Sequence, residues 1–246
     1  MMLRRRLPFT MSFHPILAAS LLILAVGSIL HAREARAIYL PCSGGPLPEA
    51  HLVGAGVSTR IDLPQRNLSA EVVLADGDLV LAALASPPAN LEEIPKGAPL
   101  VRIPASWERC FLIFLGDPTN EVFPVRVIPV NAGVLNFPQG STRVFNLSET
   151  LLGGAFGGRR IVVKPGETAT FEAPIRDFGS YPVAIDCLPK GETRPRAICR
   201  STWQHDPAAR QILFVVPQNG RIIPRVWGVL DQPRNRDNDE KTARIE

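Results

Sequence analysis

The chain is poor in the residues that metal and redox sites need. Residues 38–246 contain no methionine, only two histidines, His51 and His205, and no two cysteines in a CxxC spacing. A structural zinc site needs closely spaced ligand pairs, and a copper electron-transfer site needs two histidines, a free thiolate and usually a methionine. The composition therefore favours neither a metal centre nor a cofactor.

The chain also lacks a surplus of charge beyond its first segment. Residues 38–246 carry 22 Lys and Arg against 22 Asp and Glu, so the formal charge of +4 belongs to residues 1–37. Nucleic-acid binding relies on positive charge gathered on one surface. The balance therefore argues against a nucleic acid as a partner.

Residues 1–37 have the layout of an export signal. Three arginines at 4–6 precede an apolar run at 15–30, and Ala35-Arg36-Ala37 places small residues where a signal peptidase requires them. We predict cleavage after Ala37 and a periplasmic or secreted protein with no membrane association after cleavage. The alternative is an uncleaved anchor, because an apolar run of about 16 residues is only slightly shorter than a membrane span.

All four cysteines lie beyond the predicted cleavage site, and an even number of cysteines in an exported chain favours disulfides. Cys187 and Cys199 flank a loop that contains proline and glycine, which predicts a hairpin with the two cysteines opposite each other. That register also places Asp186 opposite Arg200, Val183 opposite Trp203 and Tyr181 opposite His205. A second disulfide, Cys42 with Cys110, follows by elimination.

Proline is abundant, with 22 of the 24 prolines in residues 38–246, and it leaves few stretches long enough for an ordinary helix. The apolar segments are short and rich in β-branched residues. Three turn sequences, Asp76-Gly77, Pro165-Gly166 and Asn219-Gly220, are each predicted to close a hairpin, the last through a type I′ turn. Strands are predicted near 110–116, 123–130, 142–147, 159–164, 167–173, 181–188, 196–204, 210–216 and 221–229. The predicted fold class is all-β.

Charge divides the predicted strands into two groups. Residues 38–122 hold five basic and ten acidic side chains and are predicted to form an N-terminal β subdomain. Residues 123–230 hold thirteen basic and seven acidic side chains, and their seven or eight strands match the count of an immunoglobulin-like sandwich. Residues 231–246 are predicted to be a disordered polar tail. A single sandwich is the alternative to two subdomains, and no internal repeat is apparent.

The segments TRVFNLS, a Gly-Gly pair and IVVKPGETATFEAP resemble the strand and turn sequences of secreted bacterial immunoglobulin-like β-sandwich proteins, many of which have no assigned activity. The resemblance covers residues 123–230. It implies a β-sandwich fold and an exported protein, and no site residue is carried over from it.

His205-Asp206 is the only candidate for acid-base chemistry, because His205 alone of the two histidines has a carboxylate beside it. A Ser-His-Asp hydrolase needs a histidine that a carboxylate orients. Adjacent side chains of a strand point to opposite faces, however, so the alternative is a turn that ends a strand at Pro207.

Trp203 and Trp227 are the candidates for a sugar-stacking surface, and Arg159 with Arg160 is the candidate contact for an anionic partner. The alternatives are core packing for the tryptophans and a solvated pair for the arginines. We therefore expect an exported, non-enzymatic β-sandwich protein that binds or assembles with an envelope protein or glycan. A secreted hydrolase that uses His205 and a carbohydrate-binding module are the alternative functions.

Overall fold

The computed structural model describes residues 33–41 and 49–232, which belong to one compact unit. These residues form sixteen β-strands, and this described part of the chain contains no helix. The predicted all-β class is confirmed. No helix among the described residues is long and apolar enough to cross a membrane.

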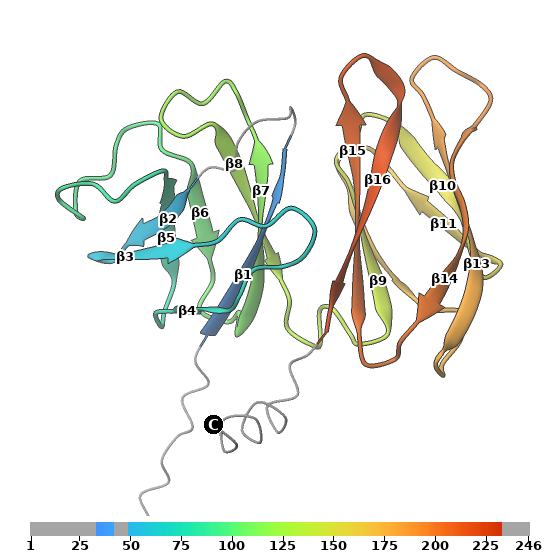
Figure 1. The fold of residues 1–246 in the computed structure, drawn as a ribbon, viewed down its shortest axis with the longest axis horizontal. Helices are drawn as coiled ribbons and strands as arrows, with labels where there is room; N and C mark the ends of the chain where they lie inside the picture. The colour runs from blue at the N-terminus through green and yellow to red at the C-terminus, as the bar shows by residue number, and fades with distance from the viewer. Residues whose placement is uncertain (1–32, 42–48, 233–246) are drawn as a thin grey trace, which may run out of the picture. The chain divides into compact units, whose positions relative to one another are not determined.

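The first eight strands form two facing sheets, which we call the first sandwich (Figure 1). They are β1 (Arg33–Leu40), β2 (Ala50–Gly54), β3 (Val57–Ile61), β4 (Val72–Leu74), β5 (Leu79–Leu84), β6 (Leu100–Ile103), β7 (Arg109–Gly116) and β8 (Val125–Asn131). One sheet has the order β4-β1-β7-β8 and the other β3-β2-β5-β6. Side chains such as Ala37, Leu52 and Phe114 fill the core between them.

The last eight strands form the second sandwich in the same way. They are β9 (Ser141–Asn146), β10 (Leu151–Phe156), β11 (Arg159–Val163), β12 (Thr168–Glu172), β13 (Gly179–Leu188), β14 (Arg196–His205), β15 (Arg210–Gln218) and β16 (Arg221–Asp231). Their sheets have the orders β12-β9-β15-β16 and β11-β10-β13-β14. Val144, Ile185 and Leu213 lie in the core between these sheets.

The two sandwiches repeat one topology. Every strand of the first corresponds to the strand numbered eight higher in the second, and in both the first strand pairs in parallel with the seventh. When Arg109 of β7 is matched with Arg210 of β15, the two parallel registers match Arg36 of β1 with Arg143 of β9. The chain therefore contains an internal structural repeat, which the sequence analysis missed.

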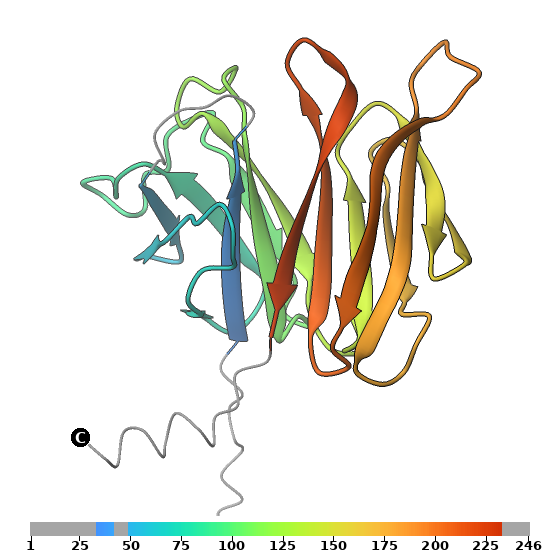
Figure 2. The ribbon, with the colours of Figure 1, turned by 45° about the vertical axis from the view of Figure 1, so that its right-hand side comes forward.

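A third apolar cluster joins the sandwiches, which lie side by side in Figure 2. Phe111 and Ile113 of β7 belong to it together with Phe145 of β9 and Phe214 of β15, and the rings of Phe145 and Phe214 stack with centroids 5.3 Å apart. The sheets that contain β7 and β15 are therefore covered on both faces. This explains why β7 is an almost continuous apolar run. A strand that is buried on both faces has no solvent-facing side, so its sequence does not alternate between apolar and polar residues.

The predicted leader overlaps the fold. Strand β1 begins at Arg33, and Ala35 and Ala37 are fully buried in the first core. Residues 1–32 lie outside the described part of the chain. Cleavage after Ala37 would divide β1, which is the second strand of its sheet and pairs on both sides.

Two further boundaries differ from those predicted. Strand β8, predicted near 123–130 as the start of the second subdomain, pairs with β7 and belongs to the first sandwich. Asp231, predicted to start the polar tail, is buried at the end of β16. Residues 233–246 of that predicted tail lie outside the described residues.

Two of the three predicted hairpins are wrong. The strands beside Asp76-Gly77 pair with different partners, β4 with β1 and β5 with β2. The strands beside Pro165-Gly166 also separate, β11 to β10 and β12 to β9. Both turns connect facing sheets, because each flanking apolar run buries its core face from the opposite side of the sandwich. Asn219-Gly220 does close a hairpin, but only Gly220 has a positive φ, so the turn is not type I′.

The predicted register of the β13–β14 hairpin is wrong, by two residues as far as Ile185 and by three beyond it. A bulge at Ile185/Asp186 places Cys199 opposite Ile185 and Cys187 opposite Arg196, and both cysteines are free thiols. Cys110 is also a free, buried thiol, and its predicted partner Cys42 lies outside the described residues. The ion pair of Asp186 with Arg200 does form, diagonally across the strands, at 2.5 Å.

Candidate functional site

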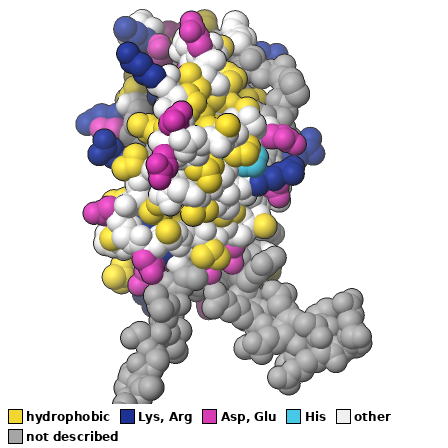
Figure 3. Space-filling model, turned by 90° about the vertical axis from the view of Figure 1, so that its left-hand side faces the viewer, with side chains coloured by type: hydrophobic (Ala, Val, Ile, Leu, Met, Phe, Trp, Pro, Cys, Tyr) yellow, Lys and Arg dark blue, Asp and Glu magenta, His cyan; other side chains and the backbone are white. Residues whose placement is uncertain are grey.

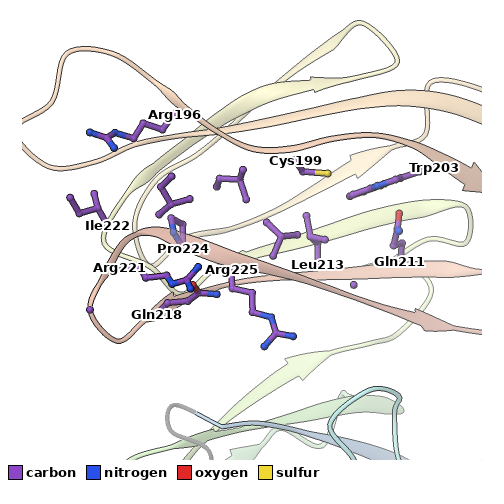
Figure 4. A pocket seen from close by; sticks show the side chains of 15 residues that line it. Arg196, Cys199, Trp203, Gln211, Leu213, Gln218, Arg221, Ile222, Pro224 and Arg225 are labelled. Atoms are coloured by element: carbon purple, nitrogen blue, oxygen red, sulfur yellow. The ribbon is translucent and has the colours of Figure 1, made fainter.

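The second sandwich is open along one edge, between β14 of one sheet and β16 of the other (Figure 4). A groove of about 850 Å³ runs between these two strands. Its lining is apolar along most of its length and includes Ile198, Trp203, Leu213, Ile223 and Val226. The same five side chains belong to the core of the second sandwich or pack against it, so the groove is an exposed side of that core.

Backbone groups border the groove on both sides. Strands β14 and β16 are each the last strand of a sheet, so one side of each strand lacks a neighbouring strand. The groove follows β16 from Arg221 to Gly228, which corresponds to ~25 Å at about 3.3 Å per residue. This length fits an extended chain of about eight residues.

The corresponding edge of the first sandwich is closed. There the core-facing residues Val101 of β6 and Val125 of β8 are each 1% exposed, and Phe123 is buried beside them. In the second sandwich, Trp203 of β14 is only half-buried. The contrast is confined to the β14 side of the groove, because Val226 of β16 and its repeat counterpart, Val127 of β8, are both half-buried.

Positive charge lies at one end of the groove, next to the β15–β16 hairpin. Arg196 and Arg221 line this end, and the groove lining contains no Asp or Glu. Arg196 forms an ion pair of 2.7 Å with Glu192, which raises the pKa of Arg196. Arg221 forms no ion pair with any described residue. Arg225 points away from the groove, with its guanidinium 5.0 Å from the ring centre of Trp227 (Figure 4).

One of the two thiols of the second sandwich lies along the groove wall. Cys199 lines the groove and is half-buried, whereas Cys187 is fully buried in the core of the second sandwich. Burial raises the pKa of the Cys187 thiol. Cys199 is therefore the more accessible of the two to reagents that enter the groove.

The structure separates the binding residues suggested by the sequence. Trp203 lies in the groove, but Trp227 packs on the other face of its sheet, toward the first sandwich. Arg159 and Arg160 lie on β11, at the opposite edge of the sheet from β14. No surface of the described residues brings all four together.

His205 lies at the end of β14 and is 7% exposed, with its ring centre 6.5 Å from that of Tyr181. The neighbouring carboxylate of Asp206 accepts the backbone N–H of Ala208 at 2.9 Å. This is the local turn geometry that aspartate favours, and it directs Asp206 to the turn rather than to His205. His205 and Asp206, the candidates for acid-base chemistry, thus occupy the end of β14 and the turn that follows it.

A buried charged cluster joins the two sandwiches and was missed by the sequence analysis. Asp231 accepts hydrogen bonds from Arg36 of the first sandwich at 2.6 Å and from the Nε of Arg210 at 2.7 Å. Arg210 also donates to the backbone oxygen of Ala132 at 2.6 Å. The sequence signal for this cluster was an arginine at the start of a mostly apolar strand, as in RQILFVV.

Arg143, the repeat counterpart of Arg36, lies close to the same cluster. Its guanidinium lies 4.5 Å from the ring centre of Phe137 and donates to the backbone oxygen of Asn131 at 3.0 Å. Burial and the nearby charge of Arg210 lower the pKa of Arg143. Because backbone oxygens, aromatic rings and Asp231 surround these arginines, the cluster fixes the contact between the sandwiches and leaves no open anion site.

The described residues contain no group of three or more His, Cys, Asp or Glu that fits a metal ion. No protein-family model matches the chain, and no curated protein sequence matches it. The groove is therefore the feature on which a functional proposal rests.

Proposed function

We propose that this protein is an exported, non-enzymatic binding component that accepts an extended strand of a partner in the β14/β16 groove. The observation that carries the proposal is the groove of about 850 Å³ between β14 and β16, in which Trp203 of β14 is only half-buried although Val101 of β6, in the equivalent strand of the first sandwich, is buried. In this proposal both sandwiches are of the immunoglobulin-like type, and the protein acts in the periplasm or outside the cell.

The physical basis is β-augmentation. A strand added at an exposed sheet edge gains backbone hydrogen bonds, and its alternate side chains enter apolar pockets. The groove offers both, because β14 and β16 are terminal strands and Trp203, Ile223 and Val226 form an apolar floor. Arg221 adds a preference for a partner strand that carries an acidic residue at the hairpin end.

The alternative functions have less support. A sugar platform needs aromatic rings on one surface. Trp203 instead packs against the core between the two sheets of the second sandwich, whereas Trp227 packs on the outer face of the β16 sheet, toward the first sandwich. A hydrolase needs an oriented histidine, whereas the carboxylate of Asp206 is engaged by its own turn.

The test uses synthetic eight-residue peptides of alternating valine and threonine with glutamate at both ends. We expect saturable binding by calorimetry, and we expect methylation of alternate backbone nitrogens to weaken it about tenfold or more, because edge hydrogen bonds are lost. Equal affinity for the methylated and unmethylated peptides would contradict strand addition.

Two variants locate the site. Arg221→Glu is expected to weaken binding of the glutamate-ended peptide and to strengthen binding of a lysine-ended one. Arg160→Glu is the matched control, since Arg160 is an exposed arginine on the far edge of the other sheet, and it is expected to leave both affinities unchanged.

The thiol in the groove gives an independent measurement. Saturating peptide is expected to slow alkylation of Cys199 in the native protein, because the occupied groove excludes the reagent. An unchanged rate at saturation would place the peptide elsewhere on the surface.

A further inference from the structure

The first sandwich also has an open edge, on the side opposite to its closed one. Strands β3 and β4 end their sheets there, and a cavity of about 130 Å³ between them is lined by Val57, Val73 and core residues such as Leu74. Val57 is 57% exposed and Val73 is 66% exposed. Such an exposed apolar edge favours pairing with another chain.

The corresponding edge of the second sandwich is covered. Ala173 and Ile175, which follow β12, pack against the core there, and Phe171 meets Phe156 edge-on at 5.7 Å. Pro174 lies so close to Gly157, in the turn between β10 and β11, that a side chain at that position would clash with it. Each sandwich therefore has one closed edge and one open edge. The open edges are not equivalent in the repeat, because one lies between β3 and β4 and the other between β14 and β16.

The two sandwiches also carry opposite net charge. Residues 33–131 hold eight Lys and Arg against eleven Asp and Glu, a sum of −3, and residues 132–232 hold twelve against eight, a sum of +4. The turn after β4 exposes Asp76 and Asp78, whereas Arg221 lies in the groove of the second sandwich. Figure 3 shows the outer face of the first sandwich, with acidic side chains among apolar ones and Lys and Arg near the margins.

From these observations we infer that the partner in the β14/β16 groove is a second copy of this chain, which docks through its β3/β4 edge. This inference rests on the proposed function and names its partner. In place of a single extended strand, the groove receives two short terminal strands of the copy, β3 and β4, and each continues one sheet of the first sandwich into one sheet of the neighbouring molecule's second sandwich. Because the two surfaces differ, the contact is heterologous, and its repetition produces open chains of molecules rather than a closed dimer.

The test measures assembly of the protein, as isolated from the producing cells, by sedimentation velocity over a wide concentration range. We expect a series of species that grows with concentration and shortens at high salt, because the two edges attract by charge. A monomer at every concentration, or a symmetric dimer that grows no further, would overturn the inference.

Two complementary variants make the test specific. Val57→Lys with Val73→Lys blocks the donating edge with positive charge, and Arg221→Glu blocks the receiving groove. Each variant alone is expected to be monomeric. Mixed together they are expected to form a one-to-one heterodimer and nothing larger, since one still offers a groove and the other still offers an edge. The absence of that heterodimer would overturn the inference even if both variants were monomeric.

Val162→Lys is the matched control, because Val162 is a 48% exposed valine on β11, at the covered edge of the second sandwich. It is expected to assemble like the parent protein. The outcome separates the two proposals: glutamate-ended peptides that bind the groove of a strictly monomeric protein would leave the proposed function intact and remove only self-assembly. Circular dichroism checks that each variant keeps its fold.

Discussion

The carboxylate of Asp231, in the last strand, accepts a hydrogen bond of 2.6 Å from the guanidinium of Arg36, in the first strand. The side chain of Asp231 is 4% exposed and that of Arg36 is 23% exposed. Asp231 also pairs with Arg210 of its own sheet. One buried carboxylate therefore connects the two ends of the fold.

Asp231→Asn should destabilise the protein strongly. The substitution leaves the buried guanidinium of Arg210 without its counter-charge, and removal of one partner from a buried ion pair costs about 3–5 kcal/mol. Urea denaturation measures the change in the free energy of unfolding. Asp177→Asn is the control, since Asp177 is exposed, and it should cost under about 0.5 kcal/mol. Similar values for the two variants would show that the buried cluster contributes little.

A chain that begins at Ile38 should fail to fold, whereas one that begins at Arg33 should fold. Residues 33–37 pair with β4 and β7, and Arg33 donates hydrogen bonds to the backbone oxygens of Trp107, Ala75 and Pro104 at 3.0, 3.0 and 2.6 Å. Their removal breaks these hydrogen bonds and opens the first core, where Ala35 and Ala37 are fully buried. Thermal denaturation followed by circular dichroism compares the two forms.

The pairing of residues 33–37 with β4 and β7 also limits where a processed N-terminus can lie. If the leader is removed in the cell, intact-mass analysis of the exported protein should show a first residue at or before Arg33. A mature protein that begins at Ile38 and unfolds cooperatively would contradict this placement of β1.

Alkaline pH should destabilise the protein through Cys110. Burial raises the pKa of the Cys110 thiol to about 12 from its usual 9.0, so the folded chain keeps a proton that the unfolded chain releases. This contribution to stability is fully present below pH 9 and is lost as the pH rises toward 12, with a slope of about 1.4 kcal/mol per pH unit.

The measurement compares the parent protein with Cys110→Ala by urea denaturation from pH 8 upward. The alanine variant should start less stable, because it leaves a small cavity, and the difference should narrow as the pH rises. Ser69→Ala, which removes a buried hydroxyl that does not titrate, should keep a constant difference. A constant difference for Cys110→Ala as well would refute the assigned pKa shift.

Gly154→Ala should cost more than an ordinary strand substitution. Gly154 has a φ of +147°, and a methyl group there would overlap the backbone oxygen of Ala184 in the neighbouring strand β13. Strain and overlap together should cost about 3 kcal/mol or more. Gly158→Ala is the matched control, since its φ is +87° but no atom lies within 4 Å, and it should cost about 1 kcal/mol. Equal losses would argue against the close approach of β10 and β13.

Local signals predicted some of the fold correctly. The strand at 110–116 and the hairpin at Asn219-Gly220 follow from short apolar runs and a two-residue turn, both of which depend on neighbouring residues only. The turn at Pro165-Gly166 also forms, with Gly166 at a φ of +74°, but it joins two sheets. A turn sequence specifies a change of direction, and the burial of the flanking strands decides whether those strands pair.

The repeat shows why the candidate site was only partly predictable. Trp203 was singled out as an aromatic residue in a strand, and it does line the groove. Ile223 and Val226 were not, because ordinary aliphatic residues in a strand give no sign of whether their core is closed. Phe123 is buried at the edge of the first sandwich, whereas Trp203 at the corresponding edge of the second is only half-buried.

Proline spacing and short β-branched runs determined by themselves that this chain is all-β, because both act through the backbone preferences of adjacent residues. Tertiary structure alone decided that β1 pairs in parallel with β7 across more than 70 residues, that Asp231 joins Arg36, and that the β14/β16 edge stays open. Those outcomes depend on which apolar faces find cover from distant segments, and no local pattern of residues records that choice.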